Sequence, residues 1–103
     1  MSTIAIGSET RPLEQADPEW ITQQINRRRQ EGASVCVRVQ IKTSDLNIPF
    51  ATPTCASSGG GGGRPPTARE QGFLDLWIKH KLNEREFSPG NVVAFVKQVL
   101  RLI

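Results

Sequence analysis

The sequence predicts an α+β fold, a small two-layer domain in which an antiparallel β-hairpin packs on a helical hairpin. Two segments, residues 35–42 and 48–55, alternate apolar and polar side chains, which is typical of half-buried strands. Two later segments place apolar residues at helical spacing, and each begins with a capping residue. The expected order is helix, strand, strand, Gly-rich loop, helix, helix. The 103 residues suffice for one core, so we expect a single domain over 1–103.

The N-terminal part predicts one helix after a short irregular segment. Residues 1–16 hold a brief apolar alternation and are expected to form a flexible arm or a short edge strand. Asp17 and Pro18 then predict a helix start, because aspartate caps free amides and proline suits the first turn. Gly32 marks the end of this helix. Its narrow apolar face makes the helix peripheral in this prediction, and that face comprises Trp20, Ile21 and Ile25.

The two alternating segments predict a hairpin whose second strand lies at an edge of the sheet. Pro49 and Pro53 support the edge position, because proline is tolerated where its missing amide faces no partner. A four-residue loop over 44–47, which contains Asp45, would pair Ile41 with Phe50. The exposed edge of this hairpin could also accept a strand from another chain.

The same register places Cys36 opposite Cys55, which makes a disulfide geometrically feasible. Disulfides are rare in reducing compartments. For a cytoplasmic protein we therefore expect two reduced thiols without a redox role.

Residues 56–66 are expected to form a disordered Gly/Pro-rich loop. Ordering ten residues costs roughly 10–20 kcal/mol, and this stretch has almost no apolar side chain to offset that cost. Glycines before a helix start, together with Arg64, also suggest a phosphate loop. The Lys-Ser/Thr pair of a Walker loop is missing, so a flexible connector is favoured.

The C-terminal part predicts two strongly apolar helices. The first starts at the capping box of Thr67 and Glu70, and the second starts at Ser88 and Pro89. A two-stranded hairpin and one thin helix offer little cover for them. We therefore expect a homodimer or a protein partner to cover the surplus, through the interaction residues Phe73, Trp77, Leu82, Leu102 and Ile103.

A net charge of +3 supports an alternative hypothesis, weak binding of nucleic acid. The candidate residues form a diffuse basic surface and comprise Arg27, Arg28, Arg29, Arg38, Lys42 and Arg64. The connection before the last helix is long for a helix-turn-helix, and the outer face of the hairpin carries no aromatic side chain for base stacking. This hypothesis therefore ranks second.

The sequence favours a non-enzymatic protein without cofactors. Cys36, Cys55 and His80 supply three of the four ligands that a structural zinc site needs, so no metal site is expected. No acid, base and nucleophile can be grouped into a catalytic site. The first residues are too short and polar for a signal peptide, and no apolar run reaches the length of a membrane span. We therefore expect a cytoplasmic interaction module that makes no contact with membranes.

Overall fold

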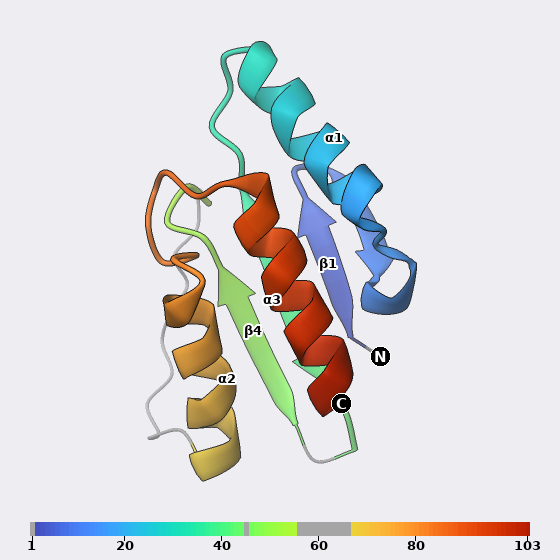
Figure 1. Ribbon diagram of the computed structural model, residues 1–103, viewed down its shortest axis with the longest axis vertical. Helices are drawn as coiled ribbons and strands as arrows, with labels where there is room; N and C mark the ends of the chain where they lie inside the picture. Colours follow the sequence, from blue (N-terminus) through green and yellow to red (C-terminus); the bar gives the residue numbers. More distant parts are fainter. Residues whose placement is uncertain (1, 45, 56–66) are drawn as a thin grey trace.

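The computed structural model describes residues 2–44, 46–55 and 67–103, and Figure 1 shows their arrangement. A four-stranded antiparallel sheet, in the order β2-β1-β3-β4, carries helices on one face. In chain order the elements are β1 (Thr3–Ile6), β2 (Glu9–Pro12), the 3-10 helix η1 (Leu13–Gln15), α1 (Pro18–Gln30), β3 (Val37–Lys42), β4 (Asn47–Ala51), α2 (Ala68–Lys79) and α3 (Pro89–Leu102). The mixed helix and strand composition is confirmed, although two strands precede the first helix. The predicted loop 56–66, with Arg64, lies outside the described residues, as does Asp45.

The N-terminal segment only partly matches the expectation of a flexible arm or short edge strand over 1–16, because β2 is a short edge strand but β1 is not. β1 and β2 form a hairpin, and β1 lies inside the sheet between β2 and β3. Gly7 closes the hairpin with a φ of +62°, a conformation that glycine adopts without strain. Ile4 and Ile6 are fully buried. Four-residue strands with two apolar positions give a weak sequence signal, which explains the error.

The hairpin of β3 and β4 is confirmed, with β4 at the edge of the sheet. Its register differs from the prediction by two residues, because Ile41 pairs with Ile48 and Val39 pairs with Phe50. The Thr43 N–H donates to the Leu46 carbonyl at 2.9 Å, so the strands close nearer to the turn than expected. A shift of two residues keeps the same side chains on the buried face.

Cys36 and Cys55 form a disulfide, with their Cα atoms 4.6 Å apart. The expectation of two reduced thiols is therefore wrong, whereas their predicted proximity is confirmed. The shifted register does not bring them together by itself. The chain turns after Thr52, where the Cys55 N–H donates to the Thr52 carbonyl at 3.0 Å, and this turn returns Cys55 to the start of β3.

The helix starts agree with the sequence signals, except that the Asp17 side chain makes no capping hydrogen bond at the start of α1. Pro18 opens α1, the Thr67 hydroxyl accepts the Glu70 N–H at 3.2 Å, and the Ser88 hydroxyl accepts the Asn91 N–H at 3.3 Å. α1 is less peripheral than expected, since it is the main helical neighbour of α3 and Ile25 is fully buried. In the described ranges, no helix is long and apolar enough to cross a membrane.

An aromatic cluster joins β4 to both C-terminal helices. The Phe50 ring of β4 stacks on Trp77 of α2 with ring centroids 5.1 Å apart. Phe95 of α3 meets both rings edge-on, at 6.0 Å from Phe50 and 5.2 Å from Trp77. This cluster continues into the aliphatic core between the sheet and α1, so one core runs through the domain.

Candidate functional site

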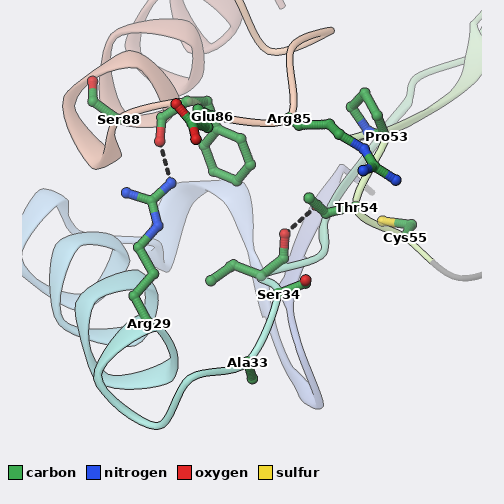
Figure 2. A pocket seen from close by; sticks show the side chains of 11 residues that line it. Arg29, Ala33, Ser34, Pro53, Thr54, Cys55, Arg85, Glu86 and Ser88 are labelled. Carbon is green, nitrogen blue, oxygen red and sulfur yellow. Dashed lines mark hydrogen bonds between the residues drawn. The ribbon is translucent and has the colours of Figure 1, made fainter.

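A groove of about 860 Å³ opens where β3 begins and where the turn after β4 ends (Figure 2). We call it the disulfide groove, because Cys55 lines it. Its walls are residues 33–35 after α1, residues 53–55 after β4 and residues 85–88 between α2 and α3. The groove therefore combines segments that lie far apart in the sequence.

Arg29 of α1 fixes one wall of the disulfide groove. Its guanidinium donates a hydrogen bond to the Phe87 carbonyl and lies 5.2 Å from the centroid of the Phe87 ring (Figure 2). Phe87 itself is buried. The cation thus holds the connection between α2 and α3 against α1, which is a structural role.

The opposite wall is built on threonines. The buried Thr52 hydroxyl accepts the Val37 N–H at 3.1 Å and lies 2.7 Å from the Thr54 hydroxyl. Thr54 also donates to the Val35 carbonyl, as Figure 2 shows. These bonds hold the turn after β4 against the start of β3, so the disulfide is positioned from both sides.

The mouth of the disulfide groove is polar. The side chain of Arg85 extends from the α2–α3 connection toward Pro53 and Thr54, on the side of the groove that Cys55 lines (Figure 2). Arg85 and the neighbouring Glu86 are exposed. A small thiol or another polar molecule could therefore reach Cys55 beside a cationic side chain.

Three of the five predicted interaction residues lie in the core. Phe73, Trp77 and Leu82 are buried, with Trp77 only 4% exposed. The prediction that they contact a partner is therefore corrected. The prediction assumes that a two-stranded sheet is too small to cover these side chains. In the structure β1 and β2 supply two further strands and α1 packs on α3, so the side chains are covered within the chain.

The other two interaction residues are exposed at the end of α3. Leu102 is 57% exposed and Ile103 is 45% exposed, and Leu100 beside them is 36% exposed. We call these three residues the C-terminal patch. Leu100 borders two hollows, one of about 500 Å³ toward Leu13 and one of about 430 Å³ along α3.

The structure separates the predicted basic residues. Arg27 pairs with Glu31 at 3.9 Å on the surface of α1, and the Arg28 guanidinium lies against the turn at Gly7. Arg29 belongs to the disulfide groove. On the opposite side of the sheet, Arg38 and Lys42 are exposed on the outer face of β3. One continuous basic surface is therefore not formed by the described members of this set.

His80 ends α2, and its ring centroid lies 6.4 Å from that of Phe95. Burial lowers the pKa of His80 below its ordinary value, and the charge of Lys79 lowers that pKa further. Within the described ranges, no three His, Cys, Asp or Glu side chains gather as metal ligands.

The disulfide groove was missed at the sequence level. The apposition of Cys36 and Cys55 was a signal for it, but the contact of Arg29 with Phe87 joins residues 58 positions apart and has no local signature. A scan against protein-family models and searches of curated proteins and solved structures gave no match to this chain.

Proposed function

We propose that this chain is a non-enzymatic protein-interaction module that self-associates through the C-terminal patch. One observation carries the proposal: Leu100, Leu102 and Ile103 all expose apolar side chains within the last four residues of the sequence, and Leu100 and Ile103 line the same hollow. Single exposed apolar residues are ordinary on protein surfaces, whereas a cluster marks a contact surface.

A second copy of the chain is the partner that this surface fits best. In a two-fold dimer each surface meets itself, so a protrusion must lie beside a hollow of matching size. Leu100 borders two such hollows. A two-fold arrangement can therefore place the exposed apolar side chains of each copy in the hollows of its partner.

The size of the patch sets the expected strength. A stable interface buries about 800 Å² on each partner, and three side chains with the rims of their hollows supply less than that. We therefore expect a weak, concentration-dependent dimer whose affinity changes little with salt, because apolar contacts are not screened.

Sedimentation equilibrium over about 1–500 µM protein, at low and high salt, tests the proposal. Leu100→Glu should weaken the dimer at least about tenfold, because Leu100 borders both hollows and the change places a charge within an apolar contact. Ile78→Glu is the matched control, since Ile78 is 47% exposed but lies on α2 and lines neither hollow. A monomer at every concentration, or equal effects of the two variants, would refute self-association through this patch.

Weak nucleic-acid binding is the second candidate, and it is supported by the outer face of the sheet. Arg38, Gln40 and Lys42 alternate along β3 on this exposed face, which places the two cations about 13 Å apart. The face offers contacts to phosphates but no aromatic stacking from the described strands. Of the six basic residues proposed from the sequence to bind nucleic acid, this candidate function therefore uses Arg38 and Lys42.

Anisotropy of a labelled single-stranded oligonucleotide, titrated at 50 and 200 mM salt, tests this candidate. Affinity that falls steeply with salt and drops in the Arg38→Ala/Lys42→Ala double variant would support it. Arg69→Ala/Lys79→Ala is the control for net charge, because it removes the same charge from exposed positions of α2. An equal loss in both double variants would leave no role for the sheet face.

A cytoplasmic location, expected from the sequence, remains part of the proposal. Disulfides that form in reducing compartments are usually transient and exchange with other thiols. The disulfide of this chain should therefore be open to exchange if the protein works there.

A further inference from the structure

The Cys36–Cys55 disulfide lies beside the core rather than within it. Both cysteines are half-buried, whereas the core is a continuous cluster of apolar side chains from every helix and from three of the strands. The chain has no other cysteine with which either could pair. The disulfide therefore lies at the edge of the core, and Cys55 is accessible from the disulfide groove.

We propose that this disulfide is a thiol–disulfide exchange site, and that a reductant entering the disulfide groove attacks the Sγ atom of Cys55. The reductant belongs to the class of small thiols or dithiol proteins. This inference is independent of the proposed self-association, because the groove lies at the start of β3 and the C-terminal patch lies near its other end, where Lys42 and Ile103 line one hollow.

Access selects Cys55 over Cys36. Cys55 is one of the residues that line the groove, and Cys36 is not. The Cys36 backbone is also held within the sheet, where its carbonyl accepts the Gly7 N–H at 3.0 Å. An incoming thiolate therefore reaches Cys55 through the groove, and Cys36 is the sulfur that leaves.

Arg85 provides the favourable charge. It lines the same groove and extends toward the turn that carries Cys55 (Figure 2). A thiolate is the attacking species in exchange, and a second thiolate leaves, so the reaction carries negative charge throughout. Arg29 and Arg85 outnumber the one carboxylate, Glu86, among the charged residues that line the groove, so the lining attracts the attacking anion.

The exchange balances without any further reactant. A thiolate of the reductant bonds to Cys55 Sγ, the Cys55–Cys36 bond breaks, and the electron pair leaves with Cys36 as a thiolate that takes a proton from water. A second thiolate, from the same dithiol protein or from a second small thiol molecule, then attacks the reductant's sulfur atom in the mixed disulfide. Cys55 is then released as a thiol, and the reductant holds the new disulfide.

The fold should persist after reduction. The Thr52 N–H donates to the Val37 carbonyl at 3.0 Å, and Thr54 donates to the Val35 carbonyl. These hydrogen bonds keep the turn after β4 on the start of β3 without the covalent link. Reduction would thus release residues 36–55 from a closed loop and alter the groove wall while the core stays intact.

The test uses reduced glutathione on the folded, oxidised chain. The reaction is quenched with acid at short times, the thiols are alkylated, and the chain is digested with trypsin. Cleavage after Arg38 and Lys42 separates the two cysteines into different peptides. We expect glutathione on Cys55 and the alkyl group on Cys36. Glutathione mainly on Cys36, or exchange at the rate of global unfolding, would overturn the proposal.

Single-cysteine variants keep the test decisive if the mixed disulfide closes again before the quench. The Cys55 thiol of Cys36→Ser should react with oxidised glutathione about tenfold faster than the Cys36 thiol of Cys55→Ser. Arg85→Ala should slow glutathione reduction of the native chain about two- to fivefold at low salt, and Arg85→Lys should restore much of the rate. Arg69→Ala, at the exposed start of α2, is the matched control. Equal reactivity of the two thiols, or equal effects of Arg85→Ala and Arg69→Ala, would overturn the assigned roles.

Discussion

Loss of the Cys36–Cys55 disulfide should destabilise the domain without unfolding it. The bond closes a loop with a sequence separation of 19 residues. Such a link restricts the unfolded chain far more than the native chain, whose ends are already joined by hydrogen bonds. For a loop of this length the chain-entropy relation gives about 3 kcal/mol of stabilisation. Domains of this size have about 5–15 kcal/mol of stability, so the reduced chain should remain folded at 25 °C.

The magnitude can be measured by urea unfolding of three samples: the oxidised chain, the same chain in a reductant, and the Cys36→Ser/Cys55→Ser double variant. The double variant avoids a lone thiol, and half-buried positions tolerate serine. We expect both disulfide-free samples to lose about 3 kcal/mol, which corresponds to a fall of about 12–24 °C in Tm. A thiol assay confirms the oxidation state of each sample.

Two results would refute this reasoning. A loss below about 1 kcal/mol would mean that the 36–55 segment is already constrained in the unfolded chain. Complete unfolding of the reduced chain at 25 °C would show that the hydrogen bonds at Thr52 and Thr54 cannot hold the turn, and it would also contradict a folded reduced state in the exchange proposal.

Four further predictions concern the core, the turns and the titration of the domain. Gly7→Ala should lower the free energy of unfolding by at least about 1–2 kcal/mol in urea titrations, since φ is +62° and the new Cβ would lie 2.2 Å from Arg28 Cζ. Gly72→Ala is the comparison, because Gly72 lies within α2 and a new Cβ there has no neighbour within 4 Å. This change should raise the free energy of unfolding by about 0.5–1 kcal/mol. Trp77→Ala should cost about 3–5 kcal/mol by calorimetry, because the ring is buried between Phe50 and Phe95, and a cost below 1 kcal/mol would contradict its place in the core. Thr52→Val should cost about 1–3 kcal/mol in urea unfolding, because the Val37 N–H loses its hydroxyl acceptor inside the protein. The lowered pKa of His80 means that the unfolded chain binds the proton more readily, so stability should fall as pH drops below about 6.5 toward the lower native pKa, and His80→Gln should flatten this part of the stability curve measured against pH.

The elements with strong local signals could be predicted from the sequence. β3 alternates over six residues, and α2 and α3 begin with capping side chains whose hydrogen bonds are present in the structure. β1 and β2 could not be predicted in the same way. Each has four residues, and the place of this hairpin in the sheet depends on the pairing of β1 with β3, more than 30 residues later in the chain.

The two strands missing from the predicted sheet, β1 and β2, explain why core residues were predicted to contact a partner. Without two strands the sheet was too small to cover Phe73, Trp77 and Leu82, so these core residues were assigned to a partner. Leu102 and Ile103 remain exposed because they follow the last contacts of α3 with the core, which end at Val99. Burial in a helix is therefore predictable from its periodicity only when the surface that it packs against is known.

Both edges of the sheet limit how this chain can associate. In an antiparallel pair the hydrogen-bonded positions alternate. The bond from the Leu13 N–H to the Ser2 carbonyl fixes this alternation for β2, and the bond from the Thr52 N–H to the Val37 carbonyl fixes it for β4. Pro12 and Pro49 then fall at positions whose backbone faces away from the sheet.

Each edge thus lacks an amide donor at a position where an added strand would need one, and proline at such positions discourages strand addition. The edge beside β4, which the sequence suggested as a docking strand, is therefore a poor candidate. The proposed self-association is therefore expected to use side-chain surfaces, such as the C-terminal patch with its exposed apolar side chains. The prolines at both sheet edges thus favour the proposed contact through α3 over an extended sheet.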